Sequence, residues 1–228
     1  MVTLAPERDP TDTVVPFLAG KGIVVSAGHT AATYEQLRRA VDQGATMITH
    51  VFNAQPMVHH RAPGVLGVLS GAGKKPWFGI IADGVHVHPS FLRIAWEAHP
   101  RGMVLVTDAM RVLGLRDGRY EWTNGATIVK KDGRVTLGDG DTIAGSCVEL
   151  LQCVSNFVKW TGAGIAEGVR TVTESPAALL GLEGVKGCLK VGADADLVVL
   201  EEREGEWRAR EVWKFGVRVY GEGEKAKL

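Results

Sequence analysis

Short runs of apolar and β-branched residues recur along the first half of the chain, and segments with helix signals separate them. Five such runs lie at residues 2–5, 22–26, 46–49, 77–82 and 103–107. Their apolar positions are continuous rather than alternating, which is typical of parallel strands covered on both faces. Strands that alternate with helices in this way predict an α/β fold built on a parallel sheet.

Two of the intervening segments carry explicit helix signals. Thr33 and Gln36 have the spacing of a capping box, in which each side chain bonds the backbone of the other residue. Apolar residues at helical spacing follow, and Gly44 is expected to end this helix. Pro89 and Ser90 are expected to open a second helix.

The pattern changes after Asp108. Residues 119–143 read as β-hairpin material with a turn at 131–134, and helical spacing returns from Val148 onward. A helix is expected near 165–173, and Ser175 with Pro176 is expected to cap and open another. Residues 196–200 and 212–220 are expected to be strands.

Polar side chains follow the apolar runs. His29, His50, Asp83 with His86, and Asp108 come after the second to fifth runs. The carboxyl ends of parallel strands meet at one mouth of an α/β barrel, so these side chains are expected to converge there. Two imidazoles can share a divalent cation, and an aspartate can accept a proton from activated water. The pattern favours an open, catalytic metal site.

Each of these residues also has a purely structural interpretation. A histidine after a strand is commonly a hydrogen-bonded turn residue, and Asp108 could be a helix N-cap. His59 and His60 are interpreted as loop residues, His88 as a surface residue, and His99 as a helix end.

Composition narrows the class of protein. The chain has 228 residues, with 26 Lys and Arg against 26 Asp and Glu, so no basic excess favours a nucleic-acid partner. No apolar stretch reaches the roughly 18 residues that would span a membrane, and no secretory signal is recognised. Three widely spaced cysteines read as reduced thiols. We therefore expect a cytoplasmic protein with no nucleic-acid or membrane partner.

Several segments, taken in order, resemble the N-acetylglucosamine-6-phosphate deacetylases of the amidohydrolase superfamily. The resemblance rests on residues 2–7, 26–30, 49–54, 61–64, 81–86, 106–109 and 187–200. It implies that His29 and His50 are metal ligands and that Asp108 is the general base that becomes the general acid. It also implies substrate contacts from Asn53, Ala54, Arg61, His86, Ile143, Ala144 and Gly145. Gln55 and Ala144 depart from the family, which usually has Met and Ser there.

The implied reaction is the metal-dependent deacetylation of N-acetyl-D-glucosamine 6-phosphate to glucosamine 6-phosphate and acetate. The metal would polarise the amide carbonyl and acidify water, and Asp108 would carry the proton to the leaving amine. Zinc suits the ligand types best, although iron, cobalt or nickel would also fit. The resemblance further implies a homodimer in which Arg61 reaches the phosphate across the interface.

The family's early His-x-Glu-Gly-Pro motif, which supplies a metal-binding glutamate, is absent. About five βα units precede residue 110, whereas a closed TIM-like (β/α)8 barrel needs eight. We therefore expect the C-terminal part of such a metal-dependent hydrolase barrel at residues 1–185 and strands of a small β-sandwich at 186–228. The chain alone is expected to bind metal weakly and to turn over poorly.

Two other functions remain open. The chain could be another amidohydrolase, although the phosphate-binding pattern of Asn53, Ala54 and Arg61 argues against a neutral ring as substrate. It could also be a truncated, non-catalytic homologue that pairs with intact subunits.

Overall fold

A five-stranded parallel sheet forms the centre of the molecule. The computed structural model describes residues 1–223. The sheet has the strand order of the sequence, and its strands are β1 (Val2–Leu4), β2 (Val25–Ala27), β3 (Ala45–Ile48), β4 (Trp77–Ile81) and β5 (Met103–Val106). Each expected strand is confirmed to within three residues, and every pairing is parallel. Strands β1 and β5 are the two edges of the sheet.

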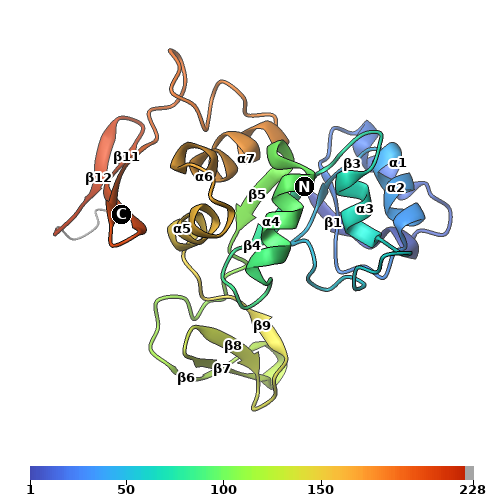
Figure 1. Cartoon of the computed structure of the whole chain (residues 1–228), viewed down its shortest axis with the longest axis horizontal. Coiled ribbons are helices and arrows are strands. Elements are labelled where there is room, and N and C mark those ends of the chain that lie inside the picture. The colour runs from blue at the N-terminus through green and yellow to red at the C-terminus, as the bar shows by residue number, and fades with distance from the viewer. Residues whose placement is uncertain (224–228) are drawn as a thin grey trace.

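Helices connect these strands and cover the sheet (Figure 1). They are the 3-10 helix η1 (Pro6–Arg8), α1 (Val14–Gly20), α2 (Tyr34–Asp42), α3 (Gly64–Ser70), α4 (Pro89–Ala98) and the 3-10 helix η2 (Pro100–Gly102). The predicted capping box is confirmed: Gln36 N–H donates to the Thr33 hydroxyl, and Thr33 N–H donates to Gln36 Oε1. Helices α1 and α3 had no clear sequence signal, because both lack a side-chain cap.

The main core lies between the sheet and helices from both halves of the chain. Ile48 and Phe78 from the sheet join Leu92 from α4 and Phe157 from α5 (Leu150–Thr161), and all four side chains are fully buried. Burial of each such side chain contributes about 1.5–3 kcal/mol. This core fixes the sheet firmly enough to position the residues at its carboxyl edge.

A separate antiparallel sheet follows β5 and lies to one side of the parallel sheet (Figure 1). It contains β6 (Gly118–Glu121), the 3-10 helix η3 (Thr123–Gly125), β7 (Thr127–Lys131), β8 (Arg134–Leu137) and β9 (Ile143–Gly145). The hairpin turn is confirmed at Asp132 and Gly133, both with positive φ, as a two-residue hairpin loop requires. Met110, Val112, Ile128 and Val135 form its own small core.

Helices α5, α6 (Ile165–Val172) and α7 (Glu174–Leu179) then return to the parallel sheet. The expected cap of the last helix is wrong. Helix α7 begins at Glu174, so Ser175 lies inside its first turn, where its buried hydroxyl accepts a hydrogen bond from Arg170 at 3.1 Å. A tertiary partner thus uses the hydroxyl that we expected to cap the backbone.

The chain ends in a three-stranded antiparallel sheet of β10 (Leu197–Arg203), β11 (Glu206–Lys214) and β12 (Val217–Gly221). Residues 212–220 are therefore not one strand as expected. Phe215 and Gly216 have positive φ and form a turn, and a strand that starts at Glu206 precedes it. Strand-forming residues on both sides of Phe215 and Gly216 concealed this turn.

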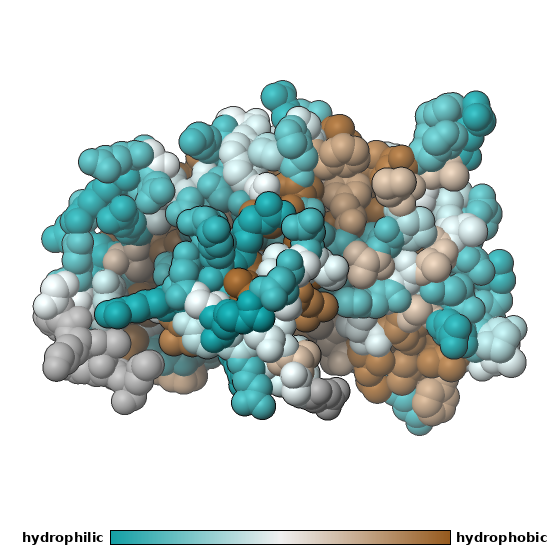
Figure 2. All heavy atoms as spheres, turned by 90° about the horizontal axis from the view of Figure 1, so that it is seen from below, coloured by the Kyte–Doolittle hydropathy of each residue, from teal (hydrophilic) through white to brown (hydrophobic). Residues whose placement is uncertain are grey.

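Figure 2 shows apolar patches interspersed with polar side chains on one face of the molecule. Exposed apolar side chains include Val2 on β1 and the consecutive residues 197–199 on β10. Within residues 1–223, no helix has the length and apolar character needed to cross a membrane.

Candidate metal and substrate site

The structure brings His29 and His50 together at the carboxyl edge of the parallel sheet. His29 follows β2, His50 follows β3, and their Nε2 atoms lie 2.9 Å apart. The two rings meet edge to face, with an interplanar angle of 70°. Two ring nitrogens from adjacent strands therefore converge on one point.

The loop that carries His29 is tied to both neighbouring strands. His29 adopts a left-handed backbone with φ of 48°, which is unusual for a residue other than glycine. The next residue, Thr30, donates its backbone N–H to the Ala54 carbonyl at 3.0 Å and its hydroxyl to Glu7. Glu7 also accepts the Ala31 N–H at 2.7 Å. These contacts hold the strained residue in place.

Glu7 was not recognised as a site residue from the sequence. Partial burial raises the pKa of its carboxyl group, but the hydrogen bonds from Thr30 and Ala31 outweigh this effect and lower the pKa. Glu7 is therefore a charged acceptor at neutral pH. Its position directly after β1 is the signal that could have identified it, because the candidate residues on the other strands occupy the same place.

The pair of histidines fits two ligand positions of a divalent cation. Neutral imidazole nitrogen is a common ligand for zinc and for other transition metals. His50 Nδ1 is buried and has no hydrogen-bond partner. Over residues 1–223, no group of three or more His, Cys, Asp or Glu side chains gathers as a metal site. The described residues therefore offer two imidazole nitrogens, one fewer than the three protein ligands typical of a catalytic zinc site.

The loop after β3 is braced by its own polar side chains. Gln55 donates to the Thr49 carbonyl at 3.0 Å and accepts the Phe52 N–H at 3.3 Å. Asn53 donates to the Val51 carbonyl at 3.2 Å, and Ala54 has a φ of 49°. A hollow of about 270 Å³ adjoins this loop, and Phe52, Gln55, His86 and Phe91 are among the residues that line it.

Asp83 and His86 form a nearly buried pair after β4. His86 Nδ1 lies 2.6 Å from Asp83 Oδ2, and each side chain is 6% exposed. Asp83 Oδ1 accepts the backbone N–H groups of Val85 and His86, each at 2.9 Å. Burial raises the pKa of Asp83, but the hydrogen bonds from His86 and Val85 lower it overall. Asp83 is thus a charged carboxylate with little access to solvent.

Asp108 follows β5, and its exposed side chain is carried by a residue with a φ of 48°. Its carbonyl accepts the Ser146 N–H at 3.0 Å, and the Ser146 carbonyl accepts the Met110 N–H at 2.9 Å. This pairing brings the strand Ile143–Gly145, which includes Ala144, next to Asp108. The alternative of Asp108 as a helix N-cap is wrong, because the next element after β5 is strand β6.

Several other candidates lie away from these groups. The side chain of Arg61 is exposed and makes no ion pair or hydrogen bond with the described residues. His59 and His60 are exposed in the same loop, as expected. His88 is exposed and caps α4 by accepting the Ser90 N–H at 3.2 Å, and His99 ends the same helix.

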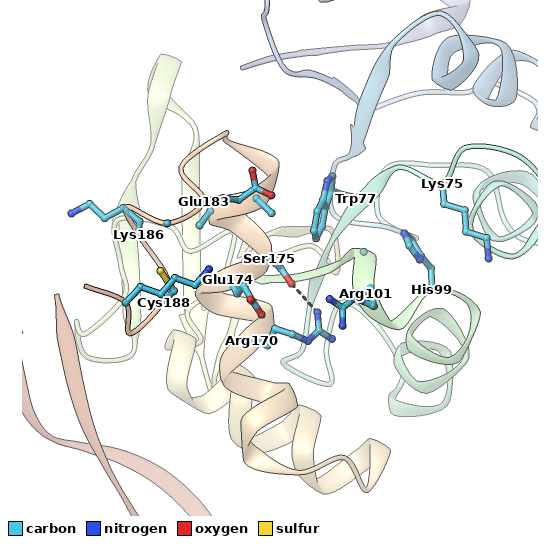
Figure 3. Close-up of a pocket in the computed structure, with 15 residues that line it drawn as sticks. Lys75, Trp77, His99, Arg101, Arg170, Glu174, Ser175, Glu183, Lys186 and Cys188 are labelled. Carbon is cyan, nitrogen blue, oxygen red and sulfur yellow. Dashed lines mark hydrogen bonds between the residues drawn. The ribbon is translucent and has the colours of Figure 1, made fainter. Parts of the chain in front are cut away.

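A larger hollow of about 510 Å³ lies at the opposite end of the strands (Figure 3). Trp77 at the start of β4 and Gly102 just before β5 line it. Arg170 and Arg101 lie near one another in it, and Arg170 bonds Ser175. Because the candidate site lies at the carboxyl ends of these strands, this hollow is separate from it.

Fold and site together define an α/β protein in which two histidines converge at the carboxyl edge of a parallel sheet. The model of the amidohydrolase family matches residues 6–215. The chain belongs to the amidohydrolase family, whose members are typically metal-dependent.

Two curated relatives and one solved structure to which this chain is similar have the same activity in their names. N-acetylglucosamine-6-phosphate deacetylases of Rattus norvegicus and Homo sapiens are each 45% identical over 207 residues, which is 89% of this chain and 50% of each relative. A structure of N-acetyl-D-glucosamine-6-phosphate deacetylase from Mycobacterium smegmatis, an Asp-to-Ala mutant in complex with N-acetyl-D-glucosamine-6-phosphate, matches with a TM-score of 0.86 and 35% identity. The match covers 96% of this chain and 57% of that one. The chain thus spans about half the length of the relatives it matches.

Proposed function

We propose that this chain is part of a metal-dependent deacetylase that acts on N-acetyl-D-glucosamine 6-phosphate. The observation that carries the proposal is the convergence of His29 and His50, with Nε2 atoms 2.9 Å apart, on the sheet edge where Asp108 also lies. The 45% identity to named deacetylases supports this substrate class.

In this proposal, His29 and His50 hold a divalent cation, most readily zinc. The cation would polarise the acetamide carbonyl and increase the acidity of water. Asp108 removes a proton from the attacking water as the water oxygen bonds to the carbonyl carbon. Asp108 then gives the proton to the nitrogen as the carbon–nitrogen bond breaks. Acetate and the free amine leave.

The loop of Asn53 and Ala54, together with His86, holds the sugar phosphate in this proposal. The side chain of Arg61 has no hydrogen-bond or ion-pair partner among the described residues, and it reaches a phosphate across a homodimer interface. The strand Ile143–Gly145 lies against the acetyl group, because its pairing through Ser146 keeps it beside Asp108.

We infer that the five parallel strands are part of a (β/α)8 barrel within a domain of residues 1–185, and that residues 186–228 add strands to a β-sandwich. The match to only about half of each relative supports this inference. A barrel of this kind obtains its further metal ligand from strands outside this sequence, so we expect little activity from the chain alone. A cytoplasmic location is part of the same proposal.

The test is acetate release by the purified chain with added zinc, with Asp108→Asn as the matched variant. We expect weak release from N-acetylglucosamine 6-phosphate, and a loss of about 100-fold or more in the variant, as for a general acid–base residue. N-acetylgalactosamine 6-phosphate is a second substrate to assay, because a deacetylase for it from Escherichia coli is 37% identical. Release that is unchanged in the variant would refute the role of Asp108.

A non-catalytic role in a complex with intact subunits remains the second candidate. The unpaired sheet edges at β1 and β5 favour it, because they can accept strands from another chain. Co-purification with a full-length relative, combined with no acetate release by the chain itself, would support this role.

A further inference from the structure

We propose that Asp83 is a positioning residue that holds His86 in the tautomer with Nδ1 protonated and Nε2 free to face a ligand. The inference rests on the proposed function only for the identity of that ligand. The contacts that place Asp83 against His86 all lie within this chain.

The hydrogen bonds around Asp83 leave one arrangement of protons. Asp83 Oδ1 accepts two backbone N–H groups, and Oδ2 lies 2.6 Å from His86 Nδ1. A carboxylate can only accept hydrogen bonds, so Nδ1 must carry a proton. The only ring nitrogen left for other partners is Nε2. Histidine beside a carboxylate is oriented in this way in catalytic triads.

The charge of Asp83 is maintained although its side chain is only 6% exposed. Its hydrogen bonds lower its pKa in spite of burial, so it is ionised at neutral pH. The negative charge of Asp83 also acts on two thiols, those of Cys147 and Cys153. Burial raises the pKa of both thiols, that of Cys153 to about 12, so both stay neutral. Asp83 is therefore a charged acceptor for the Nδ1 proton of His86.

The side chain of His86 also borders a hollow that could hold a ligand. It lines the hollow formed by the loop after β3, beside Phe52 and Gln55. A ligand group in that hollow would meet the bare Nε2 of a ring whose far side is bonded to a carboxylate. A bare Nε2 is an acceptor, so the chemical class that this arrangement recognises is a group that donates a hydrogen bond, such as a hydroxyl of the sugar phosphate.

The test is the protonation of the His86 ring, read from imidazole nitrogen shifts in histidine-labelled protein by NMR. His86→Gln assigns the signals by removing them. In the wild type, neutral His86 should show a bare Nε2. In Asp83→Asn, the two backbone N–H groups continue to donate to the side-chain amide oxygen, which leaves the amide nitrogen facing His86. The amide nitrogen then donates to Nδ1, and the ring proton moves to Nε2. Asp42→Asn, a matched change at an exposed carboxylate, should leave the ring unchanged.

A bare Nδ1 in the wild type would overturn the proposal, and this measurement needs only the His86→Gln variant, for assignment. A folded Asp83→Asn protein with an unchanged tautomer would overturn it as well. In a second arm, affinity for N-acetylglucosamine 6-phosphate with zinc should fall about tenfold in Asp83→Asn, because a protonated Nε2 can no longer accept a hydrogen bond from a ligand hydroxyl. If the wild type does not bind this ligand, the proposed function fails, and the tautomer alone decides the role of Asp83.

Discussion

At the scale of single residues, several positions around the candidate site have a left-handed backbone conformation. His29, Ala54 and Asp108 all have φ near 48°, and each lies in the segment that follows a parallel strand. Such backbone is costly for residues with a side chain, by about 1 kcal/mol or more each. Neighbouring hydrogen bonds, such as those of Glu7 to the His29 loop, must compensate for this cost.

Removal of either histidine should weaken metal binding. In His50→Ala, one of the two converging nitrogens is lost, so we expect zinc affinity to fall at least tenfold, as measured by competition with a chromophoric chelator. His59→Ala is the matched control, because His59 is exposed in a loop and should not contribute. Equal losses in both variants would contradict the assignment of His50.

At the scale of elements, the capping box is the local signal that the structure reproduces most fully. Thr33 satisfies the N–H of Gln36, and Gln36 satisfies that of Thr33. This start positions helix α2, whose buried residues Leu37, Ala40 and Val41 cover the sheet beside β2 and β3.

Thr33→Ala should lower the free energy of unfolding by about 1 kcal/mol, because a helix N–H loses its acceptor. The measurement is urea unfolding followed by circular dichroism. Thr33→Ser retains the hydroxyl and should retain most of the stability. The cap would be shown to be unimportant if Ala and Ser had the same midpoint.

The carboxylate of Asp196 bonds both to the terminal sheet and to the segment that precedes it. Asp196 accepts hydrogen bonds from Lys186 and Lys214, and the Phe215 N–H donates to it at 2.9 Å. The bonds from Lys186, Lys214 and Phe215 hold the pKa of Asp196 far below its usual value. A lowered pKa stabilises the folded form above the ordinary carboxyl pKa, and this contribution is lost as the pH falls toward the folded value.

We therefore expect the Phe215 amide to stay protected from hydrogen exchange at pH 5, and to exchange faster in Asp196→Asn. Protection in the wild type should persist to pH values below the ordinary pKa of aspartate, near 4. Asp139→Asn serves as a comparison, since Asp139 pairs with Arg119 in a different sheet. Identical exchange of Phe215 in both variants would exclude this role of Asp196.

At the scale of the whole molecule, the two unpaired edges of the parallel sheet are the main vulnerability. Strand β1 is a three-residue edge whose Val2 side chain is 39% exposed. An exposed edge offers unpaired backbone groups and invites pairing with another chain. We expect the isolated chain to self-associate.

Sedimentation should show an average mass that rises with concentration. Val2→Lys places a charge on the edge and should reduce this association severalfold, whereas Val217→Lys, at an exposed site of the terminal sheet, should not. A wild type that is monomeric at all concentrations would argue that the edges are protected.

The sequence by itself determined the five parallel strands of the central sheet and the polar residues that follow them. Each of these features depends on short-range patterns: continuous apolar runs, the Thr33–Gln36 spacing, and polar residues at fixed places after a strand. The amidohydrolase resemblance could be read in the same way, because its motifs are local and occur in order.

Only the tertiary structure decided which side chains meet. Three contacts at the site join residues that lie 21 to 38 positions apart in the sequence. They are the approach of His29 to His50, the hydrogen bond of Thr30 to Glu7, and the pairing of Ser146 with Asp108. Ser175 shows the same limit, because a partner from the preceding helix took the hydroxyl that local rules assign to a cap. Local patterns define elements, but packing chooses the partners of polar groups.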